Sequence, residues 1–398
     1  MILEHVKKNA NMKNKELKRV DIIFSPYSVE PYEILKRTMS RDKTELINEL
    51  MDSGLKGRGG AGFLTGMKWK FMAETEGDEK YVICNADEGE PGTFKDRKLL
   101  VEVPRKVFSG MAIAGWATNS KNGILYLRAE YIYLVEDLKK EIKVFDEYAK
   151  KFGLDFSIKI FLGAGAYVCG EETALIESME GKRGEPRNKP PFPIQNGYLG
   201  KPTLVNNVET FATASMVCRY GAKEYKKFGT SDQHGSKLFS ISGDSPKEGV
   251  HELELGMSIQ DFVDEFGDGD TKAVQVGGVA GFCVPRKNFS KSIIGEGNTT
   301  GGATMIFNST RSMYNVLHNY LDFFAEESCG QCTPCRVGTQ QLLKGIEAVK
   351  NGEKEPEYLD QLIKLSETMK VSSKCGLGQS VANSFASIVV NFREEMIY

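Results

Sequence analysis

No stretch of this sequence is long and apolar enough to cross a bilayer, and neither sign of charge dominates. The longest apolar candidate, residues 107–117, contains Ser109, two glycines and Trp116. It falls short of the ~18–20 residues that a membrane span needs, so it predicts a buried helix and no membrane insertion. The net charge of −2 over 398 residues argues against nucleic acid as a partner. Residues 1–19 are charged throughout and lack the apolar core of a secretory signal.

Internal repeats and low-complexity segments are also missing, and the length predicts two or three domains. Cysteine is too scarce for a disulfide scaffold, with eight residues in 398. This usage is typical of a reducing compartment, and we expect a cytoplasmic location. Four of the eight stand alone in mostly apolar surroundings and are expected to be buried thiols: Cys84, Cys169, Cys218 and Cys283.

The other four cysteines form the most informative pattern in the chain. Cys329, Cys332 and Cys335 are separated by two residues each, and Cys375 follows in a distant segment. Three closely spaced thiolates and a fourth from elsewhere suit a [4Fe-4S] cluster. Structural zinc is the alternative, but it usually takes its ligands as two separated pairs. The spacing therefore favours a chain that moves electrons one at a time.

Glycine is in excess, with 41 residues in the chain, and the excess is concentrated around 54–66 and 163–170. Glycines at this density let main-chain N–H groups approach phosphate oxygens. The first loop contains G-x-G-x-x-G at Gly57, Gly59 and Gly62. Residues 42–51 before it have helical spacing, so the loop is not a Rossmann fingerprint.

The second glycine loop lies between a predicted buried strand at 157–162 and a predicted helix at 172–180. A nucleotide binds at such a junction in an α/β sheet. Glu171 and Glu172 at the helix start would repel a phosphate, so we interpret them as ligands of ribose hydroxyls. Carboxylates that only complement the helix dipole are the alternative.

Between the two loops, a predicted strand beginning at Tyr81 runs into a turn with Asn85, Asp87, Glu88 and Glu90. Such side chains suit a divalent metal, the hydroxyls of a polyol, or an ordinary turn. Residues 182–193 mix basic residues with prolines. They either pre-organise cations against a pyrophosphate or form a solvated loop.

Together these motifs resemble one family. It comprises the flavin-bearing, NADH-oxidising subunit of respiratory complex I and the diaphorase subunits of NAD-dependent hydrogenases, formate dehydrogenases and electron-bifurcating hydrogenases. The resemblance extends from about residue 42 to residue 392. Its motifs lie, in order, at residues 57–63, 85–94, 163–173, 201–210 and 327–335.

The resemblance implies FMN, NAD(H) and a [4Fe-4S] cluster held by Cys329, Cys332, Cys335 and Cys375. FMN would contact Gly57, Arg58, Gly59, Gly60, Lys68, Asn85, Asp87, Glu88, Gly170, Glu171, Asn206, Asn207 and Thr210. The dinucleotide would contact Phe63, Phe71, Glu90, Tyr167, Glu172, Lys189 and Phe192. Within this second set the phenylalanines would face adenine, Glu172 would meet the adenine ribose, and Glu90 and Tyr167 would flank the nicotinamide. The flavin would carry the hydride, so no side chain is assigned as catalytic.

The expected fold is α/β with three domains. Residues 1–235 would form an α/β sandwich that binds FMN and NADH, with an N-terminal helical lead-in. Residues 236–311 would form a small β-grasp (ubiquitin-like) domain, with strand patterns around a helix at 259–266. Residues 312–398 would form a four-helix bundle that carries the cluster, with helices at 312–327, 334–350, 356–370 and 379–394. Thr333 and Pro334 are expected to cap the second helix, which places the cysteine triplet at an electropositive helix start.

The expected function is a flavoprotein subunit that exchanges a hydride with NAD(H) at FMN and passes single electrons through the cluster. We expect it in a soluble hydrogenase or formate dehydrogenase complex, with electron bifurcation left open. Its partners would be a thioredoxin-like [2Fe-2S] subunit and a larger iron–sulfur catalytic subunit, because the chain has no room for such domains itself. The alternative is the NADH-binding subunit of respiratory complex I. A remoter one is a non-catalytic redox-sensing subunit that binds a nucleotide and zinc.

Overall fold

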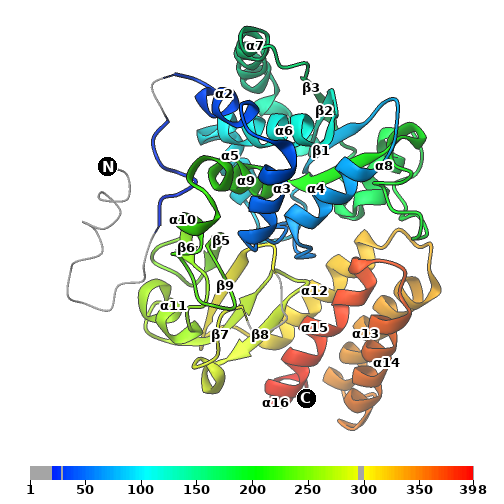
Figure 1. Ribbon diagram of the computed structural model, residues 1–398. Helices are drawn as coiled ribbons and strands as arrows, with labels where there is room; N and C mark the ends of the chain where they lie inside the picture. The colour runs from blue at the N-terminus through cyan, green and yellow to red at the C-terminus, as the bar shows by residue number, and fades with distance from the viewer. Residues whose placement is uncertain (1–19, 28–29, 295–299, 398) are drawn as a thin grey trace.

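The computed structural model describes residues 20–27, 30–294 and 300–397 (Figure 1). The expectations for residues 1–19 lie outside this part. The chain has a mixed α/β fold with a parallel sheet and a helical C-terminal part. No helix of the described residues is long and apolar enough to cross a membrane.

The first sheet consists of four parallel strands in the order β3-β2-β1-β4. The strands are β1 (Tyr81–Ala86), β2 (Asn122–Leu127), β3 (Ser157–Leu162) and β4 (Thr203–Asn207). Val82 and Ile83 on β1 belong to different apolar cores, so both faces of the sheet are covered. Asn85 pairs in register with Asn207, which places the carboxyl ends of β1 and β4 side by side. In such sheets ligands bind beyond the carboxyl ends of the strands.

Strand β3 was predicted to be buried, and this prediction was wrong. Of its residues only Ile158 is buried, and Leu162 keeps 40% of its surface exposed. The reason is its place in the sheet, since β3 pairs only with β2 and forms an edge. An apolar run by itself does not distinguish an edge strand from a central one.

Helices cover both faces of the first sheet. One face packs against a core built around α6 (Pro104–Thr118), which is almost wholly buried as residues 107–117 predict. A side chain at Gly110 would place its Cβ 2.0 Å from the Phe211 carbonyl oxygen, so glycine lets α6 and α9 approach closely. The helices of this part are α2 (Glu33–Met39), α3 (Lys43–Asp52), α4 (Thr65–Glu74), α5 (Lys95–Glu102), α7 (Val135–Phe152), α8 (Glu172–Met179), α9 (Val208–Tyr220) and α10 (Ala222–Tyr225). Short 3-10 turns are η1 (Ala129–Leu134), η2 (Tyr167–Gly170) and η3 (Tyr198–Gly200).

A second, five-stranded sheet follows in the order β6-β5-β9-β7-β8, with β5 and β9 parallel and the other pairs antiparallel. Its strands are β5 (Ser236–Gly243), β6 (Gly249–Glu254), β7 (Thr271–Val276), β8 (Phe282–Pro285) and β9 (Ala303–Asn308). A short η4 (Arg286–Asn288) follows β8. One helix, α11 (Ile259–Phe266), packs Phe262 and Phe266 against Phe239 and Ile306 of the sheet. The predicted helix at 259–266 is therefore confirmed.

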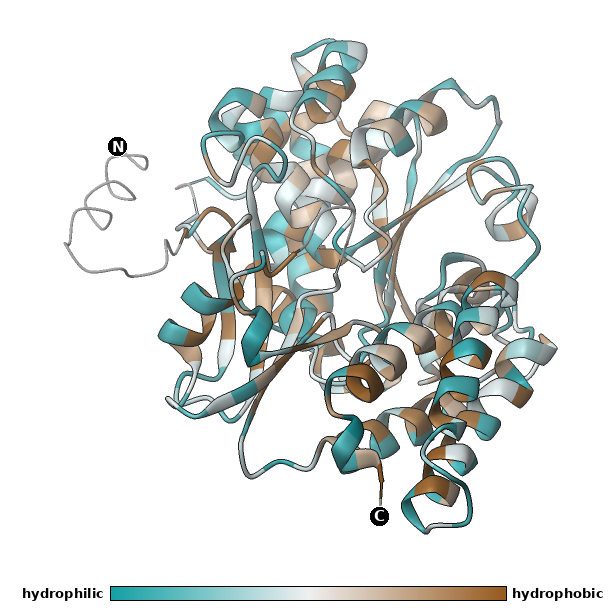
Figure 2. Ribbon diagram, turned by 90° about the horizontal axis from the view of Figure 1, so that it is seen from below, coloured by the Kyte–Doolittle hydropathy of each residue, from teal (hydrophilic) through white to brown (hydrophobic). Residues whose placement is uncertain are grey.

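The C-terminal part is helical and contains α12 (Met313–Glu327), α13 (Thr333–Lys350), α14 (Tyr358–Ser372), α15 (Gly376–Asn391) and α16 (Arg393–Met396). Apolar residues recur along these helices (Figure 2), and Leu317, Leu342 and Phe385 belong to one shared core. Two predicted starts need correction. Thr333 is already inside α13 and Cys332 precedes it, and α15 begins at Gly376 rather than at residue 379.

Candidate functional site

A cleft of about 1650 Å³ adjoins the carboxyl ends of β1 and β4. A site for a single small ligand usually measures about 300–1,000 Å³, so this cleft has room for two. Every residue predicted to contact FMN or the dinucleotide lines it. These residues are Gly57, Arg58, Gly59, Gly60, Phe63, Lys68, Phe71, Asn85, Asp87, Glu88, Glu90, Tyr167, Gly170, Glu171, Glu172, Lys189, Phe192, Asn206, Asn207 and Thr210.

The first glycine loop lies directly against the start of α9. The Arg58 main-chain N–H donates to Thr210 Oγ1 at 2.9 Å, and Asn207 caps the helix by accepting from the Glu209 N–H at 3.0 Å. Gly60 has a φ of 110°, a conformation that L side chains rarely adopt. A glycine loop beside a helix N-terminus is electropositive and open to an anion.

Two side-chain oxygens on the cleft wall have no hydrogen-bond partner among the described residues although they are buried: Asp87 Oδ2 and Thr93 Oγ1. Burial raises the pKa of Asp87 to about 7, against the opposing effect of Arg128. Hydroxyl groups of a bound polyol would satisfy both atoms. The wall therefore fits the ribityl chain of FMN.

The neighbouring carboxylate of Glu88 stabilises the start of a helix. It accepts hydrogen bonds from the Asp96 and Arg97 main-chain N–H groups at 2.8 and 3.0 Å, which caps α5. The Tyr131 hydroxyl donates to it at 2.9 Å. Glu88 lines the cleft, but its oxygens hold the helix start.

Glu90 connects three parts of the cleft. Its carboxylate accepts from the Tyr167 hydroxyl and, at 3.0 Å, from the Ala280 main-chain N–H in the loop between β7 and β8. Burial raises the pKa of Glu90 to about 7, partly offset by the Tyr167 hydrogen bond. Tyr167 in turn donates its main-chain N–H to Glu327, at the end of α12, at 2.9 Å. The contact between Glu90 and Tyr167 agrees with their predicted common position.

The two acidic residues at the start of α8 behave differently. Glu171 caps the helix by accepting from the Thr173 and Ala174 N–H groups, as the helix-dipole alternative predicts. Glu172 lies between Lys68 Nζ at 2.7 Å and Lys189 Nζ at 2.9 Å. Burial raises the pKa of Glu172, but these two cations outweigh it and lower the value to about 2. Glu172 is therefore ionised at any working pH.

Three aromatic side chains at the rim are unusually exposed: Phe63 by 53%, Phe71 by 45% and Phe192 by 50%. Exposed aromatic faces lining one cleft suit stacking against a base. The basic segment 182–193, which includes Phe192, is mostly exposed. Arg187 pairs with Glu177 of α8 and with Glu180 just after this helix, and of the segment's basic residues Lys189 lines the cleft.

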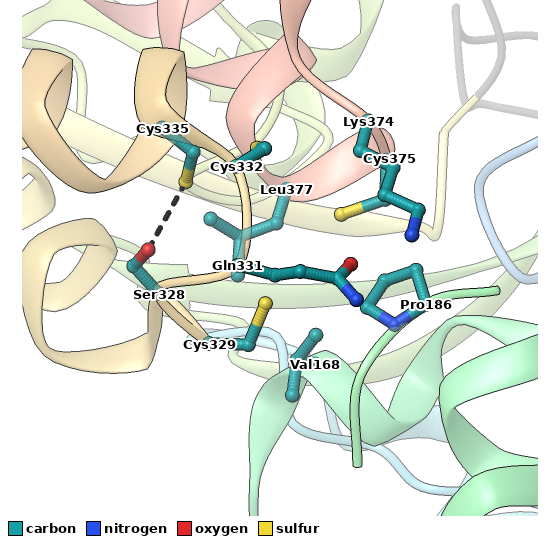
Figure 3. A pocket seen from close by; sticks show the side chains of 10 residues that line it. All are labelled: Val168, Pro186, Ser328, Cys329, Gln331, Cys332, Cys335, Lys374, Cys375 and Leu377. Carbon is teal, nitrogen blue, oxygen red and sulfur yellow. Dashed lines mark hydrogen bonds between the residues drawn. The ribbon is translucent and has the colours of Figure 1, made fainter. Parts of the chain in front are cut away.

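The four predicted cluster ligands, Cys329, Cys332, Cys335 and Cys375, surround one small pocket next to the cleft. Figure 3 shows the sulfurs of Cys329, Cys335 and Cys375 directed into the common space. No three His, Cys, Asp or Glu side chains of the described residues converge as they would on a single metal ion. Four thiols around a shared space supply the four-thiolate set that a [4Fe-4S] cluster needs.

The cysteine pocket and the cleft share part of their walls. Val168, Cys375 and Leu377 line both. Thr93, Lys95 and Asp96 also line the cleft, although no cofactor role was predicted for them. Their place in the sequence could have indicated this, because the three residues follow directly after the acidic turn that comes after β1. Ala280, Thr300 and Gly301 reach the cleft from the second sheet, and no local pattern marks them.

Comparison with known proteins gives two matching family models. Residues 50–215 match the Nuo51 FMN-binding domain, and residues 315–398 match the NADH-ubiquinone oxidoreductase-F iron-sulfur binding region. The chain is 40% identical to the NADP-reducing hydrogenase subunit HndC of Solidesulfovibrio fructosivorans, over 92% of this chain and 78% of that protein. It is 37% identical to an NADH-quinone oxidoreductase subunit of Aquifex aeolicus, over 92% and 88% respectively.

The chain belongs to this family of FMN-binding, iron–sulfur subunits. It is also 45% identical to the alpha subunit of the NAD-reducing hydrogenase HoxS of Cupriavidus necator, over 88% of this chain. A solved NAD⁺-reducing [NiFe]-hydrogenase chain in the H2-reduced state superposes with a TM-score of 0.87 at 40% identity, over 93% of this chain. This chain spans 60% of the length of the HoxS subunit and 64% of the solved chain. FMN and a [4Fe-4S] cluster are the cofactors of the two matched regions.

Proposed function

We propose that this chain is the NAD(H)-oxidoreductase (diaphorase) subunit of a hydrogenase or formate dehydrogenase complex. The proposal rests on one observation: the cleft and the cysteine pocket lie next to each other. A cleft for two ligands and a four-cysteine pocket share Val168, Cys375 and Leu377 as walls. Bound FMN accepts a hydride and releases electrons singly, which is what a four-thiolate cluster takes up.

The chain's own residues would bind and orient the reactants. The glycine loop and the start of α9 would hold the FMN phosphate, and Asp87 and Thr93 would take its polyol. The exposed ring of Phe192, with Phe63 and Phe71, would stack on adenine. Glu90 and Tyr167, bound to each other, would fix the nicotinamide end.

The side that faces a partner lies on the helical part. Val337 and Val371 are 45% and 84% exposed, and they lie two and four residues from cluster cysteines Cys335 and Cys375. Exposed apolar side chains near cluster cysteines in the sequence suit the surface of an acceptor subunit. We propose a larger iron–sulfur catalytic subunit and a thioredoxin-like [2Fe-2S] subunit as partners. We also propose the finer division into α/β sandwich, β-grasp and four-helix domains with boundaries near 235 and 311.

A second candidate is the NADH-binding subunit of respiratory complex I. Its support is the likeness to NADH-quinone oxidoreductase subunits, among them the Aquifex aeolicus protein at 37% identity. Isolating the native complex decides between them. A hydrogenase or formate dehydrogenase subunit would co-purify in the first case, and membrane-bound quinone-reducing subunits in the second.

The shared part of both candidates is tested on the isolated chain, reconstituted with FMN and iron–sulfur cluster. It should oxidise NADH with ferricyanide as acceptor, because every proposed FMN and NADH contact lies within this polypeptide. If the purified chain is instead colourless, contains zinc and lacks this activity, the redox-sensing scaffold is supported.

A further inference from the structure

Five charged side chains are buried together behind the glycine loop. We call them the buried ionic cluster: Arg58, Lys95, Asp96, Glu209 and Lys237. None is more than 6% exposed. They come from the glycine loop, α5, α9 and β5, so the group joins the first sheet's helices to the second sheet.

Glu209 is the centre of this cluster. Its Oε2 lies 2.9 Å from Lys95 Nζ and 3.6 Å from Lys237 Nζ, and its Oε1 lies 4.0 Å from Arg58 Nε. Lys95 also pairs with Asp96 at 2.7 Å. Three cations thus face two carboxylates. Lys237 Nζ and Arg58 Nε are without a hydrogen-bond partner among the described residues.

An unbalanced positive charge in a dry interior is unfavourable. Loss of the proton from Lys237 would remove this charge. Burial lowers the pKa of Lys237 to about 7; Glu209 opposes this, and Lys95 and Arg58 reinforce it. Lys95 is different, because Asp96 and Glu209 outweigh burial and raise its pKa. Of the five, Lys237 is therefore the group poised to change its charge near neutral pH.

Other titratable groups pack around these elements. Glu88 lies close enough to Lys95 to interact with it, and burial raises its pKa to about 7. On β6, Glu252 accepts from Ser236 Oγ at 2.6 Å and from the Ile23 N–H at 2.8 Å, and burial raises its pKa to about 8. The Tyr225 hydroxyl accepts from Arg58 Nη2 at 2.9 Å. These neighbours supply Lys237 with no hydrogen bond.

The cluster reaches the cleft at the place where a phosphate would bind. Arg58, Lys95 and Asn207 line the cleft. Lys95 Nζ donates to Asn207 Oδ1 at 3.2 Å, and Asn207 is the cap of α9. A Cβ at Gly59 would lie 3.2 Å from Asn207 Cβ, so the glycine loop packs closely against the start of α9. Lys237 does not line the cleft itself; it contacts Glu209, which in turn pairs with Lys95 of the cleft wall.

We propose that Lys237 is a proton-coupled counter-ion for the cofactor phosphate, neutral in the FMN-free chain and protonated once the phosphate binds at the glycine loop. The reaction transfers one proton from solvent to Lys237 Nζ, and no electron moves. The bound phosphate dianion would balance the additional positive charge, because a nearby negative charge favours the protonated form of a lysine. The inference rests on the proposed FMN site and goes beyond it, since it assigns a role in FMN binding to a residue of the second sheet.

The test is titration calorimetry on the full chain freed of FMN, at pH 8 in two phosphate-free buffers of different ionisation heat. The FMN phosphate itself is already doubly ionised there, since its second pKa is about 6. FMN should bind with uptake of nearly one proton, and riboflavin, which lacks the phosphate, with none. By linkage, FMN affinity should fall about tenfold per pH unit above pH 7.5, while riboflavin affinity should not.

Two variants and a control complete the experiment. Lys237→Met should bind FMN more weakly and without proton uptake, and Lys237→Arg, permanently charged, should bind it without uptake at any pH. Lys223→Met, at an exposed lysine, should behave as wild type. If Lys237→Met does not fold, the arginine variant and the wild-type comparison of FMN with riboflavin still decide. FMN binding without proton uptake in the wild type overturns this inference alone, whereas a chain that never binds FMN overturns the proposed function.

Discussion

Cys332 and Cys375 occupy the same position in two different helices: each is the residue immediately before the first turn, of α13 and α15 respectively. Both cysteines line one pocket, so two helix N-termini converge on it. The unpaired N–H groups and the dipoles of both helices are favourable to an anionic cluster. Sequence spacing predicts one of these helix starts, and the structure adds the second.

Replacing Cys332 by serine should therefore remove the cluster but not the flavin. The cysteine pocket loses one of four thiolate ligands, while the residues proposed for FMN are untouched. Iron and sulfide content should fall strongly, and FMN content and flavin reduction by NADH should stay near wild type. Cys218→Ser, at a cysteine outside both sites, is the matched control. Unchanged iron in the Cys332 variant would show that the ligand set is misassigned.

Glu172 should discriminate between NADH and NADPH. Its carboxylate is ionised, and a 2′-phosphate beside it would meet like charge. Because Lys68 and Lys189 already pair with it, the repulsion is partly compensated, and we expect a preference for NADH of about ten- to a hundredfold, or ~1.4–2.8 kcal/mol.

The ratio of kcat/KM for the two cofactors tests this prediction. Glu172→Gln should lower the preference for NADH over NADPH. Lys189→Gln should raise this preference. A wild type that uses both cofactors equally would refute the role of Glu172. The question is open within the family, since one 40%-identical relative is named as NADP-reducing.

Phe192→Ala should weaken dinucleotide binding with little effect on FMN. Stacking of a base on an aromatic ring is worth ~1–3 kcal/mol, which corresponds to about 5- to 150-fold in KM for NADH. Phe192 is half exposed, so its removal should hardly change stability. Leu199→Ala, at another exposed apolar side chain, is the control. A KM that does not rise would exclude Phe192 from the nucleotide site.

Glu252 should make the stability of the chain depend on pH. Its folded pKa, about 8, is raised above the ordinary value of 4.5 by burial. The folded state therefore holds a proton that the unfolded state loses, and the contribution of Glu252 to stability is fully present below about pH 4.5 and is lost as pH rises through about 8. Glu252→Gln should flatten this decline by on the order of 1–3 kcal/mol, measured as the melting temperature from pH 5 to 9. Glu248→Gln, on the exposed surface, should leave the slope unchanged; an unchanged slope in the Glu252 variant would contradict the prediction.

The residues that could be predicted from sequence are those whose chemistry is local. Cysteine spacing, glycine density and the acidic turn after Tyr81 each lie within a few residues, and the structure brings all of them to adjoining sites. Helix α11 was predicted to the residue because Ile259, Phe262 and Phe266 follow a helical period.

What could not be predicted depends on contacts far apart in the chain. The edge position of β3 depends on which strands pair, and a run of apolar residues does not state it. Lys237 lies in a strand pattern without any motif, and its burial against Glu209 appears only when α9 and β5 meet. Arg187 belongs to the basic segment that was considered for the pyrophosphate, but it pairs with Glu177 of α8 and Glu180 just after it, and it does not line the cleft.

The most direct test of the account is anaerobic addition of NADH to the isolated chain, reconstituted with FMN and cluster, in a stopped-flow spectrophotometer. We predict bleaching of the flavin absorbance followed by reduction of the cluster, with the second step absent in Cys332→Ser. A chain that binds FMN in full amount but whose flavin is never bleached by NADH would contradict it.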